Sequence, residues 1–398
     1  MDEGSDKWVL QALDREGKLV SLVSYTREEI DLLRKREQFF CPECRELLIV
    51  RAGLRVTPHF AHYKTSNCTL SLQGESEEHE KAKRNIYLWL NSQHIDAELE
   101  RYLSKLHQRP DIFFSYQQKI FAIEFQYSLT DLISMKKRNE GYITNGIIPI
   151  WFIDERLLKR TSRFTFQVNE WSLKLMHQFS PTLPFTLYSY SPNKNKLTIV
   201  TDIHLVNRRR AIANFIERKL EQLTFREIFS NERLKKKILF KIWQNEKRKF
   251  RLSAYRIYGK ELKWRKWLYE KRLYIDYLPS IVYLPTPTQH FFNVPLYYWQ
   301  SYFVIDFFHP IPIGRRFTTF QVKRFLNRYL YDDHEYPLLP YHKYPFLPYL
   351  QLLEKLKYVK KIDEHTFMKI REVKFFDHIE KASNGDDALL RYFMYNHT

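Results

Sequence analysis

The sequence predicts an α+β protein built of three parts. Residues 1–68 carry short β-rich stretches and all three cysteines, and residues 69–195 alternate between helical spacing and runs of aromatic and β-branched residues. Residues 196–398 combine apolar residues at helical spacing with many aromatic and basic side chains, which predicts a basic, mostly α-helical, aromatic-rich C-terminal domain. A chain of 398 residues is long enough to form separate cores of this kind.

The N-terminal module, residues 1–68, is predicted to be a small β-rich unit. Residues 8–13 and 18–23 have the composition of strands and flank a polar turn at residues 14–17. Thr26 and Glu29 stand at the spacing of a capping box, which predicts that a short helix begins there and ends at Arg36.

Cysteine and histidine pairs in this module have the spacing of a zinc site. Two residues separate Cys41 from Cys44 and His59 from His62, and fourteen residues separate the two pairs. Zn²⁺ takes four such sulfur and nitrogen ligands, and a bound ion stabilises a unit too small for a large core. We expect Zn²⁺ at these four residues, with Cys68 as the alternative to one histidine. The competing interpretation is that both histidines only pack in the core.

A strongly helical stretch opens the second part, at residues 74–90. Its apolar residues recur at helical spacing, at Ala82, Ile86, Trp89 and Leu90. Extending that stripe backwards brings Glu75, Glu78 and His79 onto the same face. Acidic side chains therefore stand where the first turn of the helix meets the core.

Two short strands joined by a polar turn then carry a pair of acids. Asp111 opens the first strand, at residues 112–116, and Glu124 and Gln126 lie two apart on the second, so that they share a face. Carboxylates that converge across such a hairpin can hold Mg²⁺ or Mn²⁺, and a metal-activated water is a nucleophile for phosphodiester hydrolysis. On neighbouring strands alone, an Asp and a Glu more often form a solvated face. Glu124, however, is embedded in an apolar strand where an unpaired carboxylate is costly.

The elements around this hairpin complete a known order. A basic helix is predicted at residues 130–144 and a buried strand at residues 147–153. The order helix, strand, hairpin, helix, strand is αβββαβ, which is the core of the PD-(D/E)XK nuclease-like fold. We assign residues 69–195 to this domain, with Glu75, Glu78, Asp111, Glu124 and Gln126 as candidate catalytic residues.

Several short motifs in this order resemble the competence protein CoiA family over most of the chain. They are Cys41-Pro42-x-Cys44 with His59-Phe60-Ala61-His62, Glu75-Ser76-x-x-His79-x-x-x-Lys83, Arg109-Pro110-Asp111, Ile123-Glu124-Phe125-Gln126-x-Ser128, Arg138-x-x-x-Tyr142 and Pro149-Ile150-Trp151. The resemblance implies a zinc-finger-like module, a nuclease-like domain and a family-specific C-terminal region. It also implies a cytoplasmic role in natural transformation, after single-stranded DNA has entered the cell.

One residue departs from the nuclease pattern. The third position of the sheet motif is usually Lys, and here Gln126 can orient a water but brings no charge. Lys83, Lys136 or Lys137 could supply that charge, and without it the domain could bind DNA without cutting it.

Basic residues are concentrated in one region. The net charge is +19, and residues 207–272 alone contain 22 Lys and Arg against 7 Asp and Glu. Apolar residues at 212, 215, 216, 220 and 223 predict that this region begins with an amphipathic helix, and exposed Trp264 and Trp267 could stack on bases. A basic face of this kind attracts phosphate backbones, with a solvated face or an anionic membrane surface as alternatives. Predicted nucleic-acid contacts are Lys235, Lys236, Lys237, His79, Lys83 and Arg138.

Composition also limits the cellular compartment and the classes of function that we expect for this protein. No apolar run approaches the ~20 residues of a membrane span, and the acidic N-terminus is unlike a signal peptide, so a cytoplasmic protein is expected. Only nine glycines occur, without a phosphate-cradling loop, which argues against an ATPase.

The function predicted is metal-dependent processing of incoming DNA, which we expect to be single-stranded, with recombination proteins as possible partners. Two alternatives remain open. One is a non-catalytic DNA-binding recombination mediator with a vestigial nuclease site, and the other is an RNA-binding protein that uses the same basic region.

Overall fold

The computed structural model describes residues 8–9, 11–22, 25–42, 44–53, 58–63, 68, 76–128, 132–252, 259–332, 335–340 and 342–395. The chain forms two compact units. The first comprises Met1–Leu158, Tyr188–Ile199 and Glu217–Phe229, and the second comprises Lys159–Leu187, Val200–Ile216 and Ser230–Thr398.

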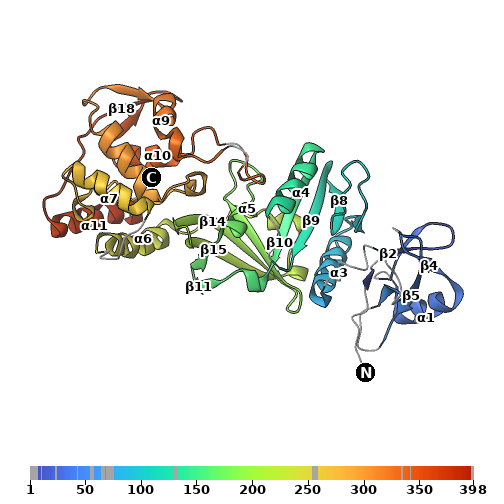
Figure 1. The fold of residues 1–398 in the computed structure, drawn as a ribbon. Helices are drawn as coiled ribbons and strands as arrows, with labels where there is room; N and C mark the ends of the chain where they lie inside the picture. Colours follow the sequence, from blue (N-terminus) through green and yellow to red (C-terminus); the bar gives the residue numbers. More distant parts are fainter. Residues whose placement is uncertain are drawn as a thin grey trace. The chain divides into compact units, whose positions relative to one another are not determined.

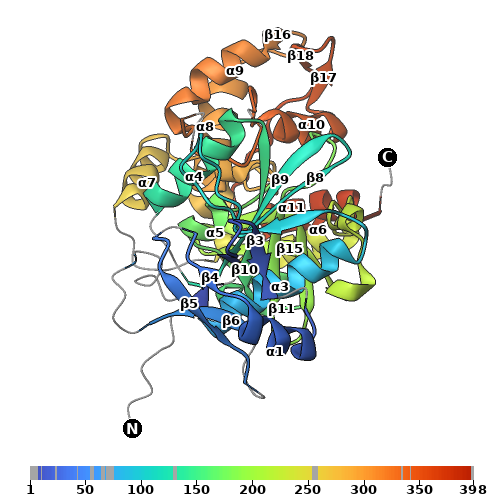
Figure 2. The ribbon, with the colours of Figure 1, turned by 90° about the vertical axis from the view of Figure 1, so that its right-hand side faces the viewer.

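Among the described residues, the N-terminal part of the first unit consists of a six-stranded sheet and one helix, drawn in blue in Figure 2. The strand order is β1-β6-β5-β4-β2-β3. The bounds are β1 (Trp8–Val9), β2 (Gln11–Leu13), β3 (Leu19–Ser21), α1 (Arg27–Arg36), β4 (Phe39–Phe40), β5 (Leu47–Arg51) and β6 (His59–His62). The predicted hairpin is the β2–β3 pair, and the predicted capping box is present at Thr26 and Glu29. Ile30 of α1 packs in one core with Phe39 and Phe60.

The predicted αβββαβ order is confirmed in the same unit. The elements are α3 (Glu77–Asn91), β7 (Ala97–Leu99), β8 (Ile112–Tyr116), β9 (Lys119–Gln126), α4 (Leu132–Thr144) and β10 (Ile147–Asp154) (Figure 1). β9 pairs antiparallel with β8 and parallel with β10. β9 is therefore a central strand, buried on both faces between α3 and α4.

Alternation along β9 decides which helix each side chain meets. Ala122 packs in one buried cluster with Tyr142 of α4, so the even-numbered residues, including Glu124, face α4. Phe125 makes an edge contact with the ring of His79 on α3, with ring centroids 5.6 Å apart. The odd-numbered residues therefore face α3.

Longer strands extend the sheet. In the first unit its order is β14-β13-β10-β9-β8-β7, and in the second it is β11-β12-β15-β14. The added elements are β11 (Arg160–Ser162), β12 (Thr165–Gln167), α5 (Glu170–Lys174), β13 (Thr186–Ser191), β14 (Lys196–Asn207) and β15 (Arg210–Lys219).

The amphipathic helix predicted at residues 212–223 is wrong, because most of that segment is β15. β14 and β15 are joined by a tight turn at Arg208 and Arg209. Ala211 and Ala213, like Ile212, are fully buried. The segment therefore packs as a strand within a sheet, and the helical spacing of its larger apolar residues was coincidental.

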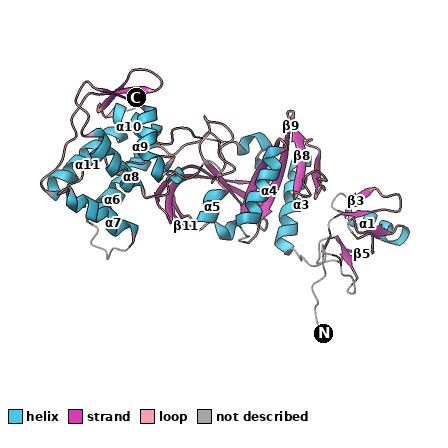
Figure 3. Cartoon of the chain, turned by 45° about the horizontal axis from the view of Figure 1, so that its top comes forward, coloured by secondary structure: helices cyan, strands magenta, loops and turns pink. Residues whose placement is uncertain are grey.

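The rest of the second unit is mostly helical, as predicted (Figure 3). Its elements are α6 (Lys236–Arg251), α7 (Lys260–Glu270), α8 (Leu296–Tyr302), β16 (Arg316–Thr318), α9 (Thr319–Leu326), α10 (Leu347–Lys355), β17 (Val359–Lys361), β18 (Thr366–Lys369) and α11 (Ile379–Tyr395). One π-helical segment, Phe303–Phe308, follows α8. Short 3-10 turns occur in the chain at Glu155–Leu157, Leu220–Gln222, Phe225–Ile228, Ile275–Tyr277, Gln289–Phe291 and Asn327–Tyr329.

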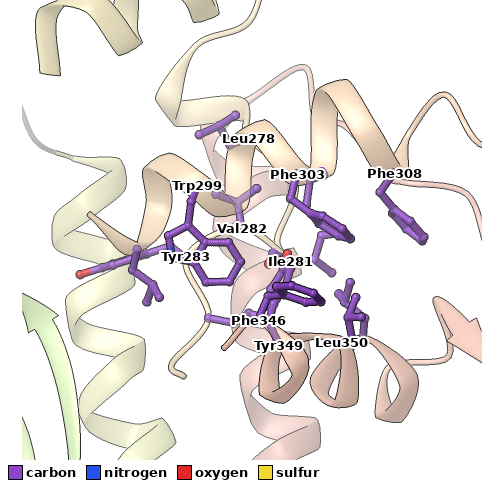
Figure 4. Packing of buried hydrophobic residues seen from close by; sticks show 14 of the residues in the cluster. Leu278, Ile281, Val282, Tyr283, Trp299, Phe303, Phe308, Phe346, Tyr349 and Leu350 are labelled. Carbon is purple, nitrogen blue, oxygen red and sulfur yellow. Dashed lines mark hydrogen bonds between the residues drawn. The ribbon is translucent and has the colours of Figure 1, made fainter. Parts of the chain in front are cut away.

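Aromatic side chains form the core of this helical region (Figure 4). Trp299 and Phe303 are fully buried, and both pack against Tyr349 with ring centroids 5.2 and 5.7 Å apart. The Tyr349 hydroxyl donates to the carbonyl of Ile281 at 2.9 Å, so its polar end is paired within the core. Across the described residues, no helix is both long and apolar enough to span a bilayer.

Candidate metal centres and nucleic-acid interface

Three thiols and one imidazole come together in the N-terminal module, after β4 and at the end of β6. The ligand atoms of Cys41, Cys44, His62 and Cys68 all lie within 4.8 Å of one another. Cys41, His62 and Cys68 are buried, and the sulfur atoms of Cys41 and Cys68 are 3.9 Å apart. Three sulfurs and one nitrogen at these separations are the donor set of a structural zinc site.

The electrostatics of this group favour a cation. Burial raises the pKa of the Cys44 thiol to about 12, and the neighbouring thiols Cys68 and Cys41 add to that rise, against a lowering by the backbone N–H of Glu46. The Glu46 carboxylate lies 3.5 Å from Nδ1 of His62. Carboxylates hold metal-binding histidines in this way, which favours Nε2 as the ligand atom.

The position of His59 corrects the predicted ligand set. His59 and His62 are both on β6, and residues three apart on a strand point to opposite faces. Only one of the two can therefore join Cys41 and Cys44. Cys68, the alternative considered from the sequence, takes the place of His59 in the group.

Asp111 and Glu124 are both buried at the hairpin of β8 and β9, with 8% and 4% of their surface exposed. The pairing of Ile112 with Ile123 brings Asp111 level with Glu124 across the hairpin. Oδ2 of Asp111 accepts the backbone N–H of Phe125 at 2.7 Å and lies 3.3 Å from Nε2 of His79. His79 therefore contacts an acid of the hairpin from α3.

Glu124 is held by two side chains of α4. Its Oε1 accepts the Nε–H of Arg138 at 2.6 Å and also the hydroxyl of Tyr142. Burial raises the pKa of Glu124 to about 7; Arg138 opposes the rise, and the charge of Asp111 adds to it. Arg138 also donates to the carbonyl of Arg109, and about a third of its side chain is exposed. The guanidinium thus lies between the buried carboxylate and solvent.

The other candidate catalytic residues are placed differently. Glu75 lies outside the described residues, and Glu78 is on α3, where its Oε2 accepts the hydroxyl of Tyr127 at 3.3 Å. Gln126 donates its side-chain amide to the carbonyl of Ser128 at 2.6 Å. In the part of the chain that the structure describes, one cluster contains three or more candidate metal ligands, namely Cys41, Cys44, His62 and Cys68. Glu78 therefore does not join Asp111 and Glu124 as a third ligand.

The structure corrects the prediction that Lys83 contacts DNA or supplies the missing charge. Lys83 has no exposed surface, and its Nζ lies 2.7 Å from Glu80 and 2.5 Å from Glu100. Its partners are acids of α3 and of the segment after β7, because the apolar stripe of α3 turns Lys83 inward. Lys136 is exposed, near Glu140 at 3.9 Å. The cation that reaches Glu124 is Arg138.

The basic charges of α6 fall into two groups. Lys235, Lys236 and Lys237, at its N-terminal end, are exposed. At the other end, Lys247 and Arg251 are buried against Asp386 of α11, and Arg248 pairs with Asp387 at 2.6 Å. The second group ties two helices together, so its charge is already matched within the protein.

Of the two tryptophans expected to stack on bases, Trp264 is a core residue and Trp267 is partly buried against the core. Trp264 is fully buried, and its Nε1–H donates to the hydroxyl of Ser301 at 2.8 Å. Trp267 stacks on Tyr302, with ring centroids 4.0 Å apart. Amphipathic helices bury large aromatic residues even when basic residues surround them in the sequence.

Three family models match successive segments of the chain. They are the N-terminal domain of competence protein CoiA at residues 22–71, its nuclease-like domain at residues 75–233 and its C-terminal domain at residues 238–382. A curated relative, competence protein CoiA of Bacillus subtilis (strain 168), is 30% identical over 271 residues, which is 67% of this chain and 71% of that protein. The chain belongs to the competence protein CoiA family. No solved structure matches it.

Asp111 and Glu124 lie in the segment that matches the nuclease-like domain of this family. The hydrogen bond that the Tyr142 hydroxyl donates to Glu124 was not predicted from the sequence. Its signal in the sequence is the spacing of Arg138 and Tyr142, four residues apart on one helix, which puts both side chains on the same face.

Proposed function

We propose that this CoiA-family protein processes DNA that has entered the cytoplasm during transformation. In this proposal Asp111 and Glu124 hold Mg²⁺ or Mn²⁺, and the domain hydrolyses phosphodiester bonds. The supporting observation is the buried, mutually coupled pair of carboxylates on the central hairpin of a nuclease-like domain. Carboxylate oxygens are the donors that Mg²⁺ prefers.

In this proposal the residues around Asp111 and Glu124 have different roles. Arg138 and Tyr142 hold Oε1 of Glu124, so Oε2 would face the ion. The Phe125 N–H and His79 orient Asp111. When bound, the ion would activate water and stabilise the charge that develops on the phosphate. The half-exposed guanidinium of Arg138 would contact the phosphate, in place of the Lys that Gln126 replaces.

A second candidate is a DNA-binding mediator that does not cut. The observation in its favour is the ion pair of Arg138 with Glu124, which already supplies a positive charge where a metal would bind. The bond from Gln126 to Ser128 adds support, because it turns that amide toward its own loop.

Cleavage assays on two variants separate the candidates. If the proposal holds, Asp111→Ala and Glu124→Ala each lower Mg²⁺- or Mn²⁺-dependent cleavage of labelled single-stranded DNA by at least about a hundredfold, since a metal contributes several kcal/mol. DNA affinity, measured without added Mg²⁺ or Mn²⁺, stays within a few-fold. Glu98→Ala, an exposed acid of β7, is the matched control and cleaves like the wild type. Cleavage by either site variant at the wild-type rate rejects the assignment, and absence of cleavage by the wild type favours the mediator.

Zinc is the second proposed cofactor, held by Cys41, Cys44, His62 and Cys68 as a structural ion. The ion would cross-link Cys41 and Cys44, which follow β4, with His62 of β6 and with Cys68, and the thiolates of Cys41 and Cys68 would lie in the core of the N-terminal module.

A further inference from the structure

Two neighbouring pockets in the second unit share a wall. One, of about 340 Å³, lies among α6, α10, α11 and the segment of Pro285 and Pro287, and the other, of about 420 Å³, lies between α10, α11 and the segment after β18. Lys355 and Tyr392 line both pockets. The hydroxyl of Tyr392 donates to the carbonyl of Lys355 at 3.0 Å, which fixes the shared wall. Both volumes are within the range of pockets that bury small organic groups.

The first pocket has a polar floor and apolar sides. Asp202 and His204, from β14, are more than nine-tenths buried and line it, together with buried Leu239 and Phe240. Nδ1 of His204 has no hydrogen-bond partner among the described residues, and Nε2 lies 3.3 Å from Oδ1 of Asp202. Asp202 adopts a left-handed backbone with φ of 55°. Such strain in a residue other than glycine is concentrated at functional sites. An apolar ring with a polar edge matches this pocket.

The second pocket is basic and aromatic. Its four cations are exposed, and the residues described as lining it include no acid. Lys357, Arg371 and Lys374 are three of them, and in the described part of the chain none of the three forms an ion pair with an acidic side chain. The guanidinium of Arg371 lies 5.2 Å from the ring centre of Tyr358. Buried Ser280, whose hydroxyl has no partner in the described structure, also lines this pocket.

Basic side chains line both pockets. Arg233 and Lys236 are exposed beside the first pocket, Lys355 belongs to both, and Arg371 and Lys374 border the second. This row differs from the cations at the C-terminal end of α6, which are matched by Asp386 and Asp387. Arg233 lies 3.6 Å from Asp202, whereas Lys236, Arg371 and Lys374 form no ion pair with an acidic side chain in the described part of the chain. Positive charge is therefore present at both pockets.

We propose that the two pockets are successive base-binding subsites for single-stranded DNA, with the row of cations following its phosphates. Unpaired bases combine a flat apolar face with a polar edge, and they bind in aromatic pockets flanked by positive charge. In the first pocket, Asp202 and His204 would bond the polar edge of the base, since a carboxylate accepts the N–H donors of bases, such as the ring N–H of thymine, and an imidazole N–H can donate to a base carbonyl. Duplex bases are stacked inside the helix and cannot enter. The inference rests on the proposed function, because it names the surface on which the same protein holds its DNA.

Binding of a fluorescent 12-nucleotide oligo-dT to the full chain, without added Mg²⁺ or Mn²⁺, tests this surface. Arg371→Glu with Lys374→Glu should weaken binding at least tenfold and reduce the slope of log affinity against log salt by about 1.4, roughly 0.7 for each contact. Lys360→Glu with Lys361→Glu is the matched control, since it makes the same charge change on β17, outside both pockets, and should bind within twofold of the wild type. Equal losses in both double variants would mean that only net charge matters, and the subsites would be rejected.

Tyr392, in the wall that the two pockets share, allows a second test of DNA binding whose result does not depend on charge. Tyr392→Ala should weaken binding about tenfold at every salt concentration, as loss of one stacked base does, whereas Tyr392→Phe keeps the ring and binds like the wild type. Unchanged binding by Tyr392→Ala, or competition by duplex DNA or by RNA of equal length that is stronger than that of single-stranded DNA, contradicts the proposal. Because no cleavage is measured, the subsites can be established even if the protein does not cut DNA. Equally, they can be rejected while metal-dependent cleavage stands.

Discussion

The thiol cluster of the N-terminal sheet and the carboxylate pair of the nuclease-like domain differ in where their compensating charge comes from. The thiol cluster contains three sulfurs and an imidazole, and burial, with the neighbouring thiols, raises the pKa of Cys44 by more than the backbone N–H of Glu46 lowers it. At the carboxylate pair, Arg138 of the same domain already lies against Glu124. Thiolates at the first site would require an external cation, whereas the second site already has a cation from the same domain.

This difference separates a structural ion from an exchangeable one. Thiolates formed in the core of a small module are stable only with a metal, so zinc binding and folding of the module are coupled. Glu124 is stable beside Arg138 and Tyr142, so a divalent ion there must bind in competition with a guanidinium. We therefore expect zinc to remain through purification, and Mg²⁺ or Mn²⁺ to bind weakly and reversibly.

Loss of the zinc site should have the largest effect. Cys68→Ser removes a ligand and should abolish the single zinc equivalent and unfold the N-terminal module, because structural zinc contributes about 10 kcal/mol or more in small zinc-binding peptides. His59→Ala should retain the zinc. Metal analysis with limited proteolysis measures both. Zinc lost in His59→Ala but kept in Cys68→Ser would restore the ligand set that the Cys/His spacing predicted.

Removal of Arg138 should have the next largest effect. Arg138→Ala leaves the buried Glu124 carboxylate without its ion-pair partner, which typically costs about 3–5 kcal/mol of unfolding free energy. Glu124→Gln in the same background should recover most of that loss, since it removes the uncompensated charge. Urea denaturation measures both variants. If Arg138→Ala is as stable as the wild type, the ion pair with Arg138 does not stabilise the buried Glu124 carboxylate.

The pKa of Glu124 predicts a smaller effect that depends on pH. Folding raises this pKa from 4.5 to about 7, so between those values the folded state binds more protons than the unfolded state. The unfolding free energy of the wild type, relative to Glu124→Gln, should fall as pH rises through this window, by up to about 3 kcal/mol. Metal affinity should rise over the same interval, because the ion needs the carboxylate. A stability difference independent of pH would show that Glu124 is ionised throughout.

Glu78 should have the smallest effect. Its described bond is a 3.3 Å contact with the Tyr127 hydroxyl, so Glu78→Gln should cost no more than about 1 kcal/mol and leave cleavage within a few-fold. A loss of cleavage as large as that expected for Glu124→Ala would instead identify Glu78 as the third ligand that the helix pattern predicted.

Local patterns in the sequence were enough to predict the αβββαβ core and the position of its acids. The hairpin of β8 and β9 follows from alternating aromatic and β-branched residues, and its register brings Asp111 beside Glu124. Side chains whose role depends on distant partners were harder to predict. Lys83 is charged and lies in a basic motif, yet Glu100, beyond the end of its helix, makes it a buried ion-pair residue.

Two further errors have the same physical origin. The segment of β15 has helical spacing of its large apolar residues, but hydrogen bonding to β12 and burial of its alanines make it a strand. The choice between His59 and Cys68 could have been narrowed, because strand alternation already separates His59 from His62. It could not be settled from sequence, since only the chain path brings Cys68 back to Cys41.

Binding of Mn²⁺ to the purified, zinc-loaded chain tests the account of the carboxylate site most directly. Electron paramagnetic resonance counts free Mn²⁺ during a titration at pH 8, above the pKa of Glu124. We predict one weak site in the wild type and in Glu98→Gln, no site in Glu124→Gln, and zinc retained in all three proteins. Mn²⁺ binding to Glu124→Gln with wild-type affinity would contradict the account, because the ion would then lie elsewhere.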